Sequence, residues 1–127
     1  MKSVMRLGAA LLAVALLAAC GGSSGTTAAQ PAGSIKVTMT EFKFDPATIS
    51  APSGKVVFWL VNAGNGTSHD LIIRDSSNNR VAGSELISAG DTIAFTVPNL
   101  AAGTYTYFCD QPGHEASGMH GVITVTA

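Results

Sequence analysis

The chain has 127 residues, with seven lysines and arginines against eight aspartates and glutamates, so its formal net charge is −1. It carries no basic stripe, which excludes nucleic acid as an expected partner. At this length the chain can build one hydrophobic core of ordinary size but not two.

The first 22 residues, MKSVMRLGAALLAVALLAACGG, have the pattern of an export signal. Two basic residues precede an apolar run, 7–19, that is shorter than the roughly 20 residues a membrane-spanning helix needs. The run ends in LAAC, which resembles the bacterial lipobox, whose cysteine is acylated and becomes the new N-terminus. The sequence therefore predicts a lipoprotein signal peptide over 1–19 and lipidation of Cys20. The alternative is ordinary A-x-A cleavage close by, with Cys20 an incidental thiol.

Residues 20–33 follow the signal and contain glycine, serine, threonine, alanine and one proline, but no charge. Such a composition cannot bury enough apolar surface to order itself, so we expect a flexible tether behind a lipidated N-terminus. Residues 34–127 are then a single domain. The expected location is outside the cytoplasm, on the outer face of the cytoplasmic membrane by its lipid anchor, or in the periplasm.

Short runs rich in β-branched and aromatic residues recur along the domain, with turn residues between them. The run 34–44 alternates apolar and polar residues, and 55–62 is almost continuously apolar, as expected of a strand covered on both faces. An exposed loop with a minor strand or turn is expected at 75–84. Further strands are expected at 48–50, 69–74, 91–97, 103–109 and 121–127.

No segment shows sustained helical periodicity, because glycine or proline interrupts every candidate helix. Seven to eight short strands in a domain of this size predict an all-β fold, a β-sandwich of the Greek-key type. A fold of this kind does not define a function, so the function has to be inferred from the residues of a binding or catalytic site.

The stretch CDQPGHEASGMH, residues 109–120, brings Cys109, His114 and Met119 together at intervals of five residues. Pro112 and Gly113 turn the chain back between the first two of these. Thiolate, imidazole and thioether are soft to borderline ligands, which favour copper over calcium or magnesium. Zinc is not excluded by the ligand types, although the methionine favours copper.

A blue-copper site needs a second histidine in addition to one cysteine, one histidine and a weak axial methionine. His69 is the candidate, because it follows a glycine-rich loop and opens an expected strand. Two other interpretations of Cys109 stay open at this point: a disulfide with Cys20, and an inert buried cysteine at the end of the strand TYTYFC.

FDPATISAPSGKVVFWLVNAGNGTSHDL, residues 44–71, and YTYFCDQPGHEASGMHGVITV, residues 105–125, resemble the plastocyanin/azurin family of small blue copper proteins, the cupredoxins. The C-x₄-H-x₄-M spacing looks most like that of the auracyanins. The resemblance implies a cupredoxin-like sandwich that holds one type 1 copper ion. The ligands that it implies are His69, Cys109, His114 and Met119.

The resemblance also implies a function: a one-electron carrier, cycling between Cu(I) and Cu(II), rather than an enzyme. The implied partners are redox proteins, such as cytochromes, membrane oxidoreductases or a terminal oxidase, and the implied state is a monomer. The alternative is a copper-binding lipoprotein that stores copper or delivers it to an oxidase. A third possibility is a β-sandwich lipoprotein that binds no metal.

Around the site, the resemblance makes His114 the ligand nearest the surface, in an apolar docking patch formed by Pro112, Gly113 and Ala116. Asp110 and Glu115 are expected to favour a partner with a positive face. 

Two further residues, Asp70 and His120, directly follow expected ligands. Asp70 stands where the family commonly has an asparagine that ties the two ligand loops together, and a carboxylate can only accept such hydrogen bonds. His120 follows Met119 in an expected strand, so it is expected to face away from the copper.

Overall fold

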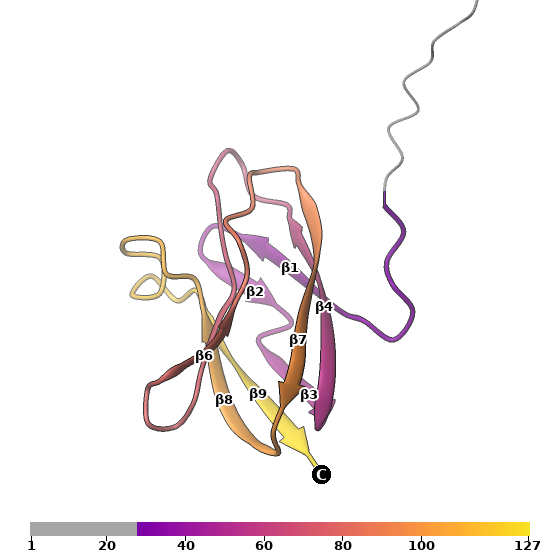
Figure 1. Cartoon of the computed structure of the whole chain (residues 1–127). Helices are drawn as coiled ribbons and strands as arrows, with labels where there is room; N and C mark the ends of the chain where they lie inside the picture. The colour runs from indigo at the N-terminus through magenta and orange to yellow at the C-terminus, as the bar shows by residue number, and fades with distance from the viewer. Residues whose placement is uncertain (1–27) are drawn as a thin grey trace, which may run out of the picture.

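The structure is a computed structural model and describes residues 28–127. Within that range the chain forms nine strands and confirms the predicted all-β fold, with one strand more than the highest expected number (Figure 1). The strands are β1 (Ile35–Thr40), β2 (Lys43–Asp45), β3 (Thr48–Pro52), β4 (Gly54–Asn62), β5 (Ile72–Arg74), β6 (Arg80–Gly83), β7 (Thr92–Leu100), β8 (Gly103–Phe108) and β9 (His120–Thr126).

The strands form two sheets, with orders β2-β1-β4-β7 and β3-β9-β8-β5-β6. The chain passes from one sheet to the other after β2, β3, β4, β6 and β7, as a Greek-key sandwich requires. Both sheets are mixed, because β1 pairs in parallel with β4 and β3 in parallel with β9.

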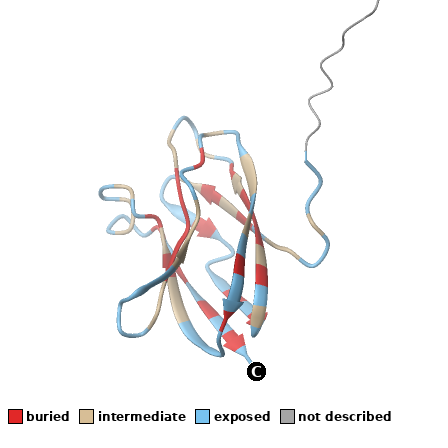
Figure 2. Cartoon of the chain, in the orientation of Figure 1, coloured by how far each residue is buried: buried red, intermediate tan, exposed pale blue. Residues whose placement is uncertain are grey.

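The core lies between the sheets and follows the period-two alternation of the strands. In β9, Gly121, Ile123 and Val125 are buried, while the residues between them are exposed. Val37 of β1 and Phe58 of β4 are 0% exposed and belong to the same core cluster. Figure 2 shows buried residues interspersed with exposed ones along the strands of the sandwich. Each large apolar side chain removed from water in this way contributes about 1.5–3 kcal/mol.

The strand boundaries differ from the expected ones in three places. The expected run 34–44 is broken because β2 folds back on β1, with Thr40 opposite Lys43, which leaves Glu41 and Phe42 as a two-residue turn. His69 does not open a strand: it forms an isolated bridge with Ile87. β7 continues beyond its expected end at residue 97 through Pro98, which is tolerated because β7 is the edge strand of its sheet.

The predicted signal peptide, 1–19, and the predicted lipidation site, Cys20, lie outside the described residues. Of the expected tether, 28–33 are described and form no strand. Over the described part of the chain, none of the secondary structure is a helix with the length and apolarity required to cross a membrane.

Candidate metal centre

Loops at one end of the sandwich bring the four expected ligands together. His69 follows the loop 63–68, and the bridge to Ile87 holds its backbone at both N–H and C=O. Cys109 directly follows β8, and Met119 directly precedes β9. His114 lies between them in the loop that projects beyond β8 and β9, drawn in gold in Figure 1.

The donor atoms of His69, Cys109 and His114 face one another. Cys109 Sγ lies 3.4 Å from His114 Nδ1 and 3.9 Å from His69 Nδ1, and the two Nδ1 atoms are 3.3 Å apart. A triangle with these sides has its centre about 2.1 Å from each corner, close to the roughly 2.0–2.3 Å of metal–nitrogen and metal–sulfur bonds. The three donors therefore fit around one metal ion.

Burial separates the four residues into two kinds. His69, Cys109 and Met119 are each 0% exposed, whereas His114 is partly exposed. Among residues 28–127 Cys109 forms no disulfide, as expected of a ligand; Cys20, its alternative partner, lies outside these residues. His114 is thus the one of the four with access to the surface.

The ligand loop is held by its own backbone. Gly113 and Gly118 have φ values of 80° and 108°, a region that side chains disfavour, and they let the chain turn twice. Met119 N donates to His114 O at 3.1 Å, and Cys109 N donates to Met119 O at 3.2 Å. These bonds join three expected ligands in one closed loop.

Asp70 connects the two ligand loops. Its side chain is 5% exposed, and Oδ1 accepts a hydrogen bond from Asp110 N at 2.9 Å. Burial raises the pKa of this carboxyl above its usual range. The carboxylate thus makes the acceptor contact that holds the loop of Cys109 to the loop of His69.

Burial also sets the protonation of the two buried ligands that can titrate. It raises the pKa of the Cys109 thiol to about 11, and it lowers the pKa of His69 below its usual value. At neutral pH without a metal, Cys109 is therefore a protonated thiol and His69 a neutral imidazole.

Metal binding is consequently expected to release the Cys109 proton, because the thiolate is the form that binds metals. With an apo pKa of about 11, the apparent affinity should rise about tenfold for each pH unit between pH 7 and 9. Competition titrations with Zn²⁺ at three pH values measure this slope. The Cys109→Ala variant should lose it, and a wild-type affinity that does not change with pH would contradict the assignment.

Two site residues were missed by the sequence analysis, and both lie in the turn between β1 and β2. The ring of Phe42 is 39% exposed and packs edge-on against that of His114, with centroids 4.8 Å apart. Glu41 Oε1 lies 3.9 Å from His69 Nε2, and backbone hydrogen bonds lower the pKa of Glu41. No motif or spacing connects this turn to the ligand loops.

The expected docking residues Pro112, Gly113 and Ala116 are all exposed beside His114. The shallow, open pocket along this loop has a volume of about 290 Å³. This volume is at the lower limit of the roughly 300–1,000 Å³ of clefts that enclose organic ligands, and the pocket is open to solvent.

The expected acidic bias of this surface is weakened, because both carboxylates face arginines. Glu115 forms an ion pair with Arg74, whose guanidinium also lies 4.3 Å above the Phe108 ring. Asp110 lies 3.9 Å from Arg80. Each carboxylate of the ligand loop thus has a positive charge beside it. 

His120, at the start of β9, is exposed, in agreement with its expected position away from the metal ligands.

Known proteins with sequences similar to this chain include an auracyanin and a plastocyanin, in agreement with the family that its sequence resembles. Auracyanin-B from Chloroflexus aurantiacus is 42% identical over 48 residues, which are 38% of this chain and 20% of that protein. A chloroplastic plastocyanin from Tetradesmus obliquus is 29% identical over 87 residues, 65% of this chain and 57% of the plastocyanin. The chain thus spans from 20% to 57% of the length of these curated relatives.

The fold leads to the same family. A crystal structure of auracyanin B superposes with a TM-score of 0.68 at 25% identity, covering 82% of this chain and 96% of the auracyanin. The family model described as a cupredoxin-like domain matches residues 9–125, most of the chain. With this fold and this set of converging side chains, the chain belongs to the cupredoxin-like domain family.

Proposed function

We propose that the chain is a type 1 copper protein that carries one electron at a time between redox proteins. Cupredoxins are copper proteins of electron transfer, in agreement with the cofactor predicted from the sequence, one copper ion. The observation that carries the proposal is the triangle of Cys109 Sγ, His69 Nδ1 and His114 Nδ1, whose size fits one metal ion.

The proposed ligands have distinct roles. Cys109 would provide a thiolate, His69 and His114 would provide imidazole nitrogens, and Met119 would provide a thioether. Copper bound there would supply a one-electron couple between Cu(II) and Cu(I). The hydrogen bonds from Cys109 N to Met119 O and from Asp110 N to Asp70 Oδ1 support a fixed ligand geometry, which keeps the reorganisation on electron transfer small.

Electrons would enter and leave through His114, because it is the ligand that reaches the surface. Phe42, Pro112, Gly113 and Ala116 form an apolar patch around it. A small apolar patch suits the weak, short-lived encounters of redox partners. The paired charges of the surrounding side chains do not favour a strongly charged partner, and a monomer leaves the patch open.

We expect no enzymatic activity. Phe108 and Asp110 flank Cys109, whereas in multicopper oxidases histidines flank the copper cysteine and lead to further copper ions. The open pocket along the ligand loop also offers little enclosure for a small substrate.

Optical spectroscopy of the copper-loaded domain tests the proposal. An intense band at about 600 nm, characteristic of a copper–thiolate bond, is expected at one copper per chain. A chain without that band would not be a type 1 copper protein. If the band is present, rapid and reversible reduction by a cytochrome without copper loss identifies a carrier, whereas transfer of the copper to an acceptor identifies storage or delivery.

Asp70→Asn is expected to raise the reduction potential, by on the order of tens of millivolts, because it removes negative charge beside Cys109. The asparagine oxygen can still accept the hydrogen bond from Asp110 N, so the loop contact is kept. Protein-film voltammetry measures the change. A midpoint that is unchanged or lower would show that the Asp70 charge does not act on the metal.

We further propose that the protein acts outside the cytoplasm, on the outer face of the membrane that holds its lipid anchor, or in the periplasm. The support is the LAAC sequence that ends in Cys20. Cys20→Ser in the full chain is expected to move the protein from the membrane fraction to the soluble fraction, since multiple acyl chains are needed for stable anchoring. Cys109→Ala should remain with the membrane, and retention of the Cys20→Ser chain there would argue against lipidation.

A further inference from the structure

His69 carries a buried polar atom that has no hydrogen-bond partner, the single such side-chain atom found within residues 28–127. The atom is Nε2, in a side chain that is 0% exposed. The other ring nitrogen, Nδ1, faces Cys109 Sγ and His114 Nδ1. A neutral imidazole has one proton, so an Nδ1 that binds a metal leaves that proton on Nε2. Nε2–H is then a buried donor that needs an acceptor.

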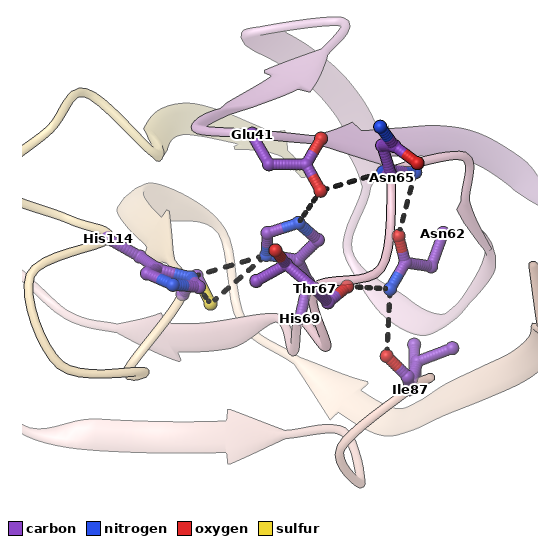
Figure 3. Close-up of polar contacts among 9 residues, drawn as sticks. Glu41, Asn62, Asn65, Thr67, His69, Ile87 and His114 are labelled. Atoms are coloured by element: carbon purple, nitrogen blue, oxygen red, sulfur yellow. Dashed lines mark hydrogen bonds and ion pairs between the residues drawn. The ribbon is translucent and has the colours of Figure 1, made fainter. Parts of the chain in front are cut away.

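The carboxylate of Glu41 lies on that side of the ring. Its Oε1 is 3.9 Å from His69 Nε2 and accepts a hydrogen bond from Asn65 N at 2.8 Å (Figure 3). A hydrogen bond needs these two atoms to be roughly 1 Å closer. The Glu41 side chain is 29% exposed, so it can rotate to close that distance. A carboxylate offers about four acceptor positions, so the bond from Asn65 leaves room for one from His69.

The loop after β4 leaves space for this carboxylate. Asn62 Nδ2 donates to Thr67 O and to Ile87 O, both at 2.9 Å, which fixes the loop that leads to His69. Gly64 N donates to Asn62 Oδ1 at 3.0 Å. A Cβ at Gly64 would lie 2.5 Å from Glu41 Oε1, so a side chain there would displace the carboxylate. The glycine therefore permits the approach of Glu41 to His69.

We propose that Glu41 is a positioning residue of the metal centre, whose carboxylate accepts the Nε2–H of His69 and leaves Nδ1 free for the metal. This inference rests on the proposed copper site. An anionic acceptor on the far side of the ring makes the imidazole a stronger donor and adds negative charge near the metal. Both effects stabilise a divalent ion, so Glu41 strengthens Zn²⁺ and Cu(II) binding and lowers the reduction potential.

Metal affinity gives the first test. In Glu41→Ala the Zn²⁺ affinity should fall by about 10–100-fold, as is typical when the outer partner of a metal-bound histidine is removed. Glu41→Gln keeps an acceptor oxygen without the charge, so it should recover most of the affinity. The midpoint potential of the copper-loaded chain should be higher in both variants. Glu85→Gln removes the same charge from an exposed glutamate and serves as the matched control.

The tautomer of His69 gives a second test that needs no metal. Nitrogen-15 NMR of the apo chain should show the proton on Nε2 in the wild type and a mixture of tautomers in Glu41→Ala. Gly64→Ala should reproduce that mixture, because its Cβ displaces the carboxylate. In the Glu41→Ala background, Gly64→Ala should have a much smaller effect, since the carboxylate that its Cβ displaces is gone and only the 3.0 Å contact with Asn62 Oδ1 remains.

The proposal is overturned if Glu41→Ala keeps the wild-type tautomer and stays within twofold of the Glu85→Gln control in Zn²⁺ affinity. It is also overturned if the effects of Gly64→Ala and Glu41→Ala simply add. Failure of the proposed function has a different signature, the absence of the band at about 600 nm in the copper-loaded wild type. The Zn²⁺ affinity and the tautomer would still report the role of Glu41 in that case.

Discussion

Cys109→Ser is expected to abolish the band at about 600 nm of the copper-loaded chain, because that band comes from the copper–thiolate bond. Serine has nearly the same shape but offers a hydroxyl, which neither ionises near neutral pH nor binds copper as a soft ligand. The loss of copper affinity should exceed the roughly 10–100-fold expected for removal of an outer partner such as Glu41. Absorbance titration with copper measures both effects.

Met119→Leu is the matched control, since it removes a sulfur from the same loop but leaves the thiolate. That variant should keep an intense copper–thiolate band. Cys109 is 0% exposed, so serine there also buries a hydroxyl at a cost of about 1–3 kcal/mol. Thermal denaturation of the apo chains separates that cost from the loss of copper. A Cys109→Ser chain that still shows the band would exclude Cys109 as the ligand.

Gly121→Ala is expected to destabilise the domain by about 3 kcal/mol, which lowers Tm by roughly 10–20 °C. Gly121 pairs with Tyr107 across β8 and β9, and the tyrosine ring lies over it. A Cβ at Gly121 would be no more than 2.5 Å from that ring and from Ala47 O. A ring fixed in the core and a backbone carbonyl cannot both move away, and Tyr107 also donates its hydroxyl to Pro46 O.

Denaturant unfolding of the apo domain measures the change in the free energy of unfolding. Val122→Ala, at the neighbouring residue of β9 that is 41% exposed, should change it by less than about 1 kcal/mol. In a Tyr107→Ala background the effect of Gly121→Ala should become smaller without vanishing, because the ring is gone while the contact with Ala47 O remains. Equal effects in both backgrounds would show that the ring is not the cause.

The ligands could be predicted from the sequence because their chemistry is rare and their spacing is local. Cys109, His114 and Met119 lie in one loop between two strands, so their convergence needs only local turns, at Gly113 and Gly118. His69 was identified by the requirement for a second imidazole. It was wrongly placed in a strand, because LIIR has the composition of one, whereas the bridge to Ile87 depends on a loop far along the chain.

Glu41 and Phe42 could not be predicted in the same way. Their approach to His69 and His114 follows from the pairing of β1 with β2 and from the packing of that hairpin beside the ligand loops. The turn between these strands contains none of the glycine or asparagine residues that usually mark one. The ion pair of Glu115 with Arg74 likewise joins residues that are 41 positions apart, so this pairing of charges at the ligand loop was not visible in the sequence.

A reductive titration of the copper-loaded chain tests the central claim most directly. One electron per chain should bleach the band at about 600 nm, and an oxidant should restore it fully, with one copper still bound after gel filtration. That result would establish the buried site of His69, Cys109, His114 and Met119 as a reversible one-electron centre. A chain that shows no such band, or that loses its copper on reduction, would contradict electron transfer as its function.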